Sequence, residues 1–368
     1  MDLSESLLEI SLLLVGAVFI GIVARRFRIP VTVVLAVGGF LVAWAAGDDV
    51  LPLVESLYGE QFAETVINLF LPILIFEATL NLSTRDFLRN LGPILVLATV
   101  ALAISATLVG FSLYYALGIS LASALLFGVL ISATDPVAVL AVFKHLGVPR
   151  RLLTLVEGES LMNDGVAIVG YSILLQVALG ESVGFVEGLA DLVTVFVGGA
   201  LIGAAIGLVS ALVLPMLDRL SAATLSLGVA FGSFVLADAV FGVSGVMATA
   251  TAGLIIGALA PSRASEPVRN TVTSLWDALA YIANALLFLF VGLLINPTLI
   301  GDNLDAIALA IVAVLIARPL AIFPLVSALE RFAGELGKSQ RQRAMGFCRM
   351  HDDACLVVDR CPQVVAIL

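Results

Sequence analysis

The sequence has little charge: only 12% of its 368 residues are Asp, Glu, Lys or Arg, against about 25% in average soluble proteins. Hydrophobic residues make up 61% of the chain. A soluble chain of this length could not bury so much apolar surface. The composition therefore excludes a soluble globular protein and indicates that lipid is the solvent for most of the chain.

Cysteine is missing from the apolar part of the chain. All three cysteines, Cys348, Cys355 and Cys361, lie near the C-terminus, and their spacing matches no zinc or disulfide pattern. A phosphate-binding loop of the Gly-x-x-x-x-Gly-Lys-Ser/Thr kind is also missing, which argues against ATP as the energy source. The first residues, Met1–Glu9, are acidic rather than basic, so we expect no cleaved signal peptide.

Apolar runs near the length of a membrane span, about 20 residues, recur along the chain. They predict an all-α polytopic membrane protein with about eleven transmembrane helices. The predicted spans are 6–24, 30–46, 62–82, 91–117, 120–143, 156–178, 186–214, 222–241, 244–260, 274–295 and 302–326.

Charges in the short loops alternate in sign along the chain. One set of loops holds every basic loop residue before the tail: Arg25, Arg26, Arg28, Arg85, Arg89, Lys144, Arg150, Arg151, Arg219, Arg263 and Arg269. In the other set of loops, all charged residues are Asp or Glu. Since basic loops stay in the cytosol, this sorting predicts an outside N-terminus and a cytosolic C-terminus.

The last part of the sequence differs in character. Scattered Arg and Asp residues after Gly337 prevent it from spanning a bilayer. We therefore expect a transmembrane domain over residues 1–330 and a cytosolic tail over residues 331–368. We interpret the tail as a frameshifted or truncated segment.

A proline follows an aspartate deep inside the fifth predicted span, in Thr134-Asp135-Pro136. Asp135 lies about 22 Å along that helix at 1.5 Å per residue. Because Pro136 cannot donate a backbone hydrogen bond, the pattern predicts an interrupted helix whose free carbonyls face an ion. The alternative is a kinked helix with a capping aspartate.

Three carboxylates, a hydroxyl and an amide gather at the start of the sixth predicted span, in Glu157-Gly158-Glu159-Ser160-Leu161-Met162-Asn163-Asp164. Glu159 and Asn163 are four residues apart, as are Ser160 and Asp164, so each pair shares a helix face. Oxygen ligands of this kind suit a hard cation. Asp164 lies about 12 Å into the predicted span, whereas Glu157 is close enough to its start to act as an N-terminal cap.

One basic residue, Arg318, falls inside a predicted span, the eleventh. A guanidinium in the membrane needs a carboxylate, and Glu159 is the best placed; the alternative is snorkelling to the interface. For Glu77 in the third span, snorkelling or a structural hydrogen bond is the favoured interpretation. Asp238 and Asp277 are also interpreted as structural.

Together these motifs resemble the NhaP/NHE-type sodium/proton antiporters of the monovalent cation:proton antiporter superfamily. The resemblance covers about residues 1–330, and Thr-Asp-Pro followed by Asn-Asp is its most specific feature. The matching stretches are 76–82 (FEATLNL), 133–139 (ATDPVAV), 157–165 (EGESLMNDG), 286–292 (LLFLFVG) and 317–319 (ARP).

The resemblance implies an antiporter-type fold and a role for each matching residue. Asp164, Asp135 and Glu159 would hold Na+, with Ser160 and the Thr134 backbone as further contacts. Asn163 and Arg318 would hold the Glu159 carboxylate. The family is usually a homodimer, normally with two more helices after the one that carries Arg318.

These implications predict a secondary transporter of the cell membrane that is not an enzyme and uses no cofactor. It would exchange Na+ or Li+ for H+, without net charge movement, by competition of ion and proton for Asp164. We expect the lipid bilayer and a second copy as its partners, and no nucleic acid. The alternatives are a K+/H+ antiporter of the same fold and a non-transporting truncated remnant.

Overall fold

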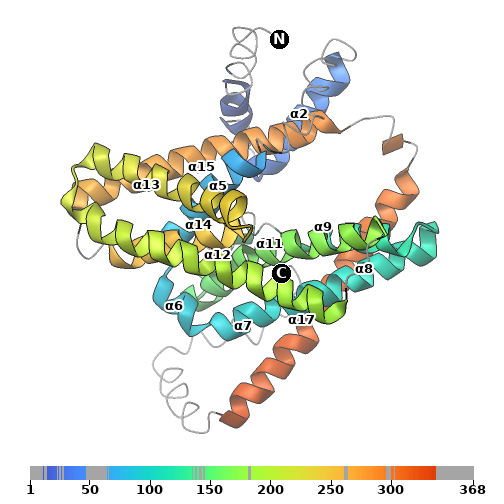
Figure 1. The fold of residues 1–368 in the computed structure, drawn as a ribbon. Coiled ribbons are helices and arrows are strands. Elements are labelled where there is room, and N and C mark those ends of the chain that lie inside the picture. The colour runs from blue at the N-terminus through green and yellow to red at the C-terminus, as the bar shows by residue number, and fades with distance from the viewer. Residues whose placement is uncertain are drawn as a thin grey trace. The chain divides into compact units, whose positions relative to one another are not determined.

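The structure is a computed structural model in which all regular elements of the described residues are helical. It describes residues 11, 15–22, 24, 26, 29–46, 64, 66–134, 136, 139–140, 143, 146–180, 184–260, 264–295, 300–301 and 303–336. Figure 1 labels the helices along the chain.

The helices before the polar cluster are α2 Val31–Ala46, η2 Val66–Phe70, α5 Leu71–Asn81, α6 Thr84–Arg89, α7 Leu91–Val96, η3 Leu97–Ala101, α8 Leu102–Leu117 and α9 Leu121–Ser132. Those that follow are α11 Arg150–Ala178, α12 Phe185–Val213, η4 Leu214–Met216, α13 Arg219–Val235, η5 Leu236–Val240, α14 Gly245–Leu259, α15 Glu266–Leu294 and α17 Leu304–Leu336.

The helices confirm the predicted polytopic architecture. Within the described residues, six helices are long and apolar enough to cross a membrane, and four shorter helices are apolar. Together they match ten of the eleven predicted segments; of the first segment, 6–24, only residues 11, 15–22 and 24 are described, and all of them are helical. In lipid, a helix is the element that satisfies every backbone hydrogen bond within one segment, which is why these runs are helical.

Two spans begin earlier than the apolar pattern predicts. The sixth begins at Arg150 rather than 156, and the tenth at Glu266 rather than 274. Both added stretches contain two charged residues, Arg150 and Arg151 in the first and Glu266 and Arg269 in the second. Hydropathy detects only the part of a helix in hydrocarbon, so it misses turns that continue into the headgroup layer.

The chain folds as two compact units. The first comprises Met1–Arg85 with Val193–Leu304, and the second comprises Asp86–Leu192 with Asp305–Leu368. Each unit combines an early and a late part of the sequence.

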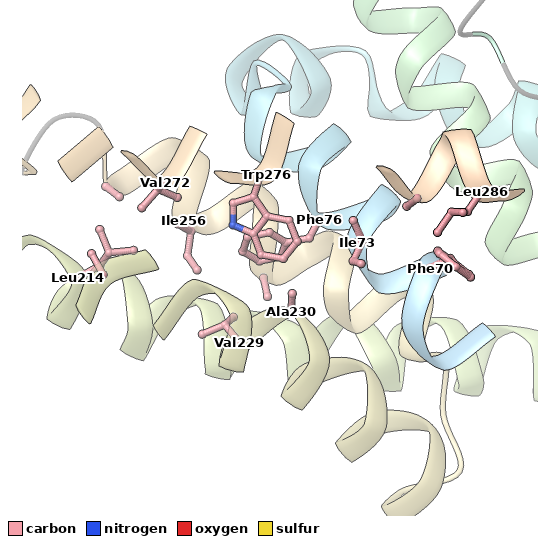
Figure 2. Close-up of a cluster of buried hydrophobic side chains, with 14 of the residues drawn as sticks. Phe70, Ile73, Phe76, Leu214, Val229, Ala230, Ile256, Val272, Trp276 and Leu286 are labelled. Carbon is pink, nitrogen blue, oxygen red and sulfur yellow. The ribbon is translucent and has the colours of Figure 1, made fainter. Parts of the chain in front are cut away.

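The first unit has a large apolar core, drawn in Figure 2. Trp276 of α15 is fully buried at its centre, with its ring centroid 4.5 Å from that of Phe76 in α5. The Trp276 indole Nε1 donates a hydrogen bond to Ser226 Oγ, 3.0 Å away. The one polar atom of the indole is thus satisfied inside the core, as burial of a tryptophan requires.

Small residues bring α12 and α14 together within the first unit. Gly199, Gly203 and Gly207 follow one another at intervals of four residues along α12. A Cβ atom on Gly203 would collide with the backbone carbonyl oxygen of Ala248 in α14. Close approach through small residues is the usual way for helices to associate in lipid, where no hydrophobic effect drives them together.

The second unit packs α9 between α8 and α11. The backbones of α8 and α9 approach closely, because a Cβ atom on Gly128 would collide with the carbonyl oxygen of Ala106. The long helix α17 contains Pro319 and Pro324. Each proline removes one backbone donor from this helix.

The close approach of α12 and α14 predicts that Gly203→Ala destabilises the protein. The added methyl group meets backbone that cannot rotate away, and overpacking of this kind typically costs about 1–3 kcal/mol. We expect a lower thermal unfolding midpoint in detergent. Gly228→Ala in α13 is the matched control, since its Cβ would meet nothing within 4 Å. A Gly203→Ala variant as stable as Gly228→Ala would contradict the packing.

Candidate functional site

Helix α9 ends inside the predicted fifth span, as the Thr-Asp-Pro pattern indicated. Its last residue is Ser132, and Ala133 is extended, with φ −73° and ψ 127°. Thr134 and Pro136 are not helical, and Asp135 lies outside the described residues. The break leaves carbonyl groups of α9 without intrahelical donors.

Two side chains from elsewhere in the second unit supply donors to this broken end. Arg318 Nη1 in α17 donates to the Ser132 carbonyl oxygen at 3.0 Å, and Ser160 Oγ in α11 donates to the Thr134 carbonyl oxygen at 3.1 Å. Arg318 thus satisfies the last carbonyl of α9, and Ser160, a predicted ion contact, satisfies the carbonyl of Thr134 in the break.

Helix α11 carries the polar cluster and begins earlier than the sequence predicted. Asp164 lies about 21 Å along the helix from Arg150. Because the added turns precede the predicted span, the depth of about 12 Å into that span stays a prediction. Asn163 and Ser160 are buried, and Asp164 is half-buried. Glu157 lies two turns into the helix, whose N-cap is Pro149, so the interpretation of Glu157 as an N-terminal cap is wrong.

Glu159 is the centre of a charged network that joins α11 and α17. Arg318 Nη2 lies 3.6 Å from Glu159 Oε1, and the two side chains are only 16% and 14% exposed. Asn163 Nδ2 also donates to Glu159 Oε1, at 3.2 Å. The arginine is thus paired with a carboxylate, which favours this interpretation of Arg318 over snorkelling.

The Asn163 amide has one satisfied side and one unsatisfied side. Its Oδ1 atom is buried and has no hydrogen-bond partner within the described part of the chain. An unsatisfied buried acceptor costs about 1–3 kcal/mol. The orientation in which the Asn163 amide donates to Glu159 therefore leaves its carbonyl oxygen without a hydrogen bond in the described part of the chain.

A serine pair that the sequence analysis missed fixes the end of α9. Ser132 Oγ donates to Ser105 Oγ of α8 at 3.2 Å, and both residues are buried. Serine in an apolar span has no spacing signal of its own, so Ser105 could not have been identified from the sequence. Glu77, in contrast, accepts a hydrogen bond from Asn81 Nδ2 at 2.8 Å, in line with the structural interpretation.

The structure thus brings Glu159, Arg318 and Asn163 into one network and joins Ser160 to Thr134. Asp164 lies four residues after Ser160 on α11. The predicted three-carboxylate Na+ set stays a prediction, because it includes Asp135. Among the described residues, no group of three or more His, Cys, Asp or Glu could hold a metal ion.

Comparison with known proteins gives consistent matches. Residues 12–350 match the family described as "Sodium/hydrogen exchanger, transmembrane". The Na(+)/H(+) antiporter NhaH of Halobacillus dabanensis is 35% identical over 329 residues, which cover 86% of this chain and 80% of the relative. The Na(+)/H(+) antiporter NhaS2 of Synechocystis is 35% identical over 322 residues, and the alignment spans 87% of this chain but only 57% of that relative.

The fold also matches a solved structure. The sodium proton antiporter MjNhaP1 of Methanocaldococcus jannaschii aligns with a TM-score of 0.76 at 22% identity, over 92% of this chain and 80% of that one. The likeness confirms the antiporter-type fold with a discontinuous helix.

The ion pair predicts that Arg318→Ala destabilises the protein by about 3 kcal/mol, the lower end for a broken buried pair, because both side chains keep some exposure. The loss leaves Glu159 without its cation and the Ser132 carbonyl without its donor. Thermal unfolding in detergent measures the effect, with Arg269→Ala, an exposed residue of α15, as the control.

The double variant Arg318→Ala/Glu159→Ala distinguishes loss of the ion pair from loss of side-chain packing. If the charges interact as the structure shows, the double variant unfolds at a higher temperature than Arg318→Ala alone. Strictly additive losses would contradict the pairing.

Proposed function

Because the chain belongs to the transmembrane sodium/hydrogen exchanger family, we propose that it exchanges Na+ or Li+ for H+ across the cell membrane. It would act as a secondary transporter rather than an enzyme and would need no cofactor. The observation that carries the proposal is the hydrogen bond by which the Ser160 hydroxyl of α11 reaches the Thr134 carbonyl, just after the broken end of α9.

The ion site proposed here consists of Asp164, Asp135, Glu159, the Ser160 hydroxyl and the Thr134 carbonyl. The Ser160–Thr134 hydrogen bond supports it, because it holds two of these oxygens 3.1 Å apart at the helix break. Carboxylate, hydroxyl and carbonyl oxygens are the ligands that hard cations prefer.

Coupling follows from the cost of charge in lipid. An ionised carboxylate in the hydrocarbon region is expensive to move across it, and either a proton or a sodium ion at Asp164 neutralises it. The site therefore crosses the hydrocarbon region only when a proton or a sodium ion is bound to Asp164. Exchange then requires no ATP, because each gradient drives the opposite flux.

Pairing of Glu159 supports exchange without net charge movement. Arg318 and Asn163 hold the Glu159 carboxylate, so its negative charge is balanced by the guanidinium whichever ion is bound. One proton and one sodium ion then alternate at Asp164. We propose a stoichiometry of one to one.

The charge sorting of the loops supports an N-terminus outside the cell and a C-terminus in the cytosol. We further propose a homodimer whose interface lies outside the ion-binding residues, as the resemblance to the family implies. The transmembrane domain over residues 1–330 and the cytosolic tail over residues 331–368 also remain proposals.

Replacement of Asp164 is the direct test. Asp164→Asn keeps the size and polarity of the side chain but cannot alternate between an ionised and a neutral form, so we expect sodium-dependent proton flux to disappear. The measurement is the pH change that Na+ causes inside proteoliposomes of the purified full chain. Asp277→Asn, at an exposed position of α15, is the matched control.

The same assay separates the alternatives. Flux with Na+ or Li+ but not with K+ supports the proposed selectivity, and flux with K+ alone indicates a K+/H+ antiporter. A well-folded wild-type chain without any cation-dependent pH change would indicate a non-transporting remnant. Full activity of Asp164→Asn would exclude Asp164 as the exchange site.

A further inference from the structure

A second polar site lies within the first unit, where α13 and α15 begin. It is an open cavity of about 530 Å3, lined by Arg219, Glu266, Pro267, Asn270, Thr271 and Ser274. None of these residues belongs to the proposed ion site. Cavities of about 300–1,000 Å3 are typical of small-ligand sites.

The cavity lies at the level of the lipid headgroups. Helix α15 has 29 residues and is about 44 Å long at 1.5 Å per residue, whereas the hydrocarbon core is only about 30 Å thick. Part of the helix must therefore extend beyond the hydrocarbon, and the first turns, which contain Glu266, Arg269 and Asn270, are the polar end. Glu266, Asn270 and Ser274 are spaced four residues apart and form a polar stripe along these turns.

Two opposite charges face this cavity without neutralising each other. Within the described part of the chain, neither Arg219 nor Glu266 forms an ion pair. Asp218, next to Arg219, is occupied in capping α13: its Oδ2 accepts the backbone N–H of Leu220 at 3.2 Å. A hydrogen bond from the Ser221 hydroxyl lowers the pKa of Asp218. The described lining of the cavity thus presents one cation and one anion to its contents.

We propose that this cavity binds the phosphoethanolamine headgroup of a membrane phospholipid. The Arg219 guanidinium binds the phosphate, for which its planar donors are suited. The primary ammonium donates its N–H groups to the Glu266 carboxylate, with the Asn270 carbonyl and the Ser274 hydroxyl as further acceptors. A zwitterion matches the charges of the cavity one for one.

Other headgroups fit the cavity less well. A choline group has no N–H to donate and is recognised by aromatic rings, and the described lining residues include no aromatic side chain. An anionic glycerol headgroup, or free phosphate, would satisfy Arg219 but leave Glu266 facing a like charge. The binding inferred here does not depend on which ion the protein exchanges.

Lipid retention on the full chain tests the proposal. Purified protein in detergent receives dioleoyl phosphatidylethanolamine, phosphatidylcholine or phosphatidylglycerol at equal mole fraction, and native mass spectrometry counts the bound lipids. We expect phosphatidylethanolamine to be retained about fivefold more than the other two, near the upper limit for solvent-exposed charge pairs. Equal retention of all three lipids would overturn the proposal.

Two variants test which lining residue binds the ammonium group and which binds the phosphate. Glu266→Gln is expected to reduce retention of phosphatidylethanolamine to the level of phosphatidylcholine, and Arg219→Gln to reduce retention of both. The matched controls are Arg269→Gln and Asp277→Asn, two exposed residues of α15 outside the cavity. Unchanged lipid selectivity in Glu266→Gln would overturn the assignment, and thermal midpoints show whether each variant is folded.

Water-soluble glycerophosphoethanolamine separates a lipid from a soluble ligand. Without acyl chains it has only the headgroup contacts, so we expect it to displace bound phosphatidylethanolamine only at a large molar excess. Displacement at equimolar concentration would overturn the assignment to a membrane lipid.

Discussion

The guanidinium of Arg318 is the contact on which the polar interior of the second unit depends. It pairs with Glu159 of α11 and donates to the carbonyl of Ser132 at the broken end of α9. Both partners need it, since a charge and an unsatisfied carbonyl are each costly in a membrane. The Arg318 side chain therefore balances the Glu159 charge, supplies a donor to the Ser132 carbonyl, and joins α17 to α9 and α11.

Much of this arrangement could be predicted from the sequence because the membrane restricts the choices. Apolar length predicts the spans, Pro136 predicts the break, and a lone Arg318 in a span predicts a carboxylate partner. Helix starts were predicted less well, since Arg150 and Glu266 begin turns that lie beyond the hydrocarbon. The Ser105–Ser132 pair could not be predicted, because a serine in an apolar run can equally bond to its own helix.

The two units hold their helices together by partly different means. The first combines an apolar core around Trp276 with close backbone contact along Gly203 and its neighbours, and Trp276 adds a hydrogen bond to another helix. The second also has hydrogen bonds between helices, and it adds an ion pair. Its polar contacts carry a cost, seen in the unsatisfied Oδ1 atom of Asn163. An apolar residue would avoid this cost, and an uncompensated polar group of this kind is expected at a functional site.

Proline at positions 319 and 324 gives α17 a particular mechanical property. Pro319 removes the backbone hydrogen bond to the carbonyl of Leu315, and Pro324 removes the one to Leu320, so α17 has fewest hydrogen bonds in the turn that contains Arg318 and in the next turn. Resistance to bending is therefore lowest beside the residue that joins α17 to its neighbours. A bend of α17 would therefore be centred beside Arg318, and it would change the position of the guanidinium that contacts the end of α9.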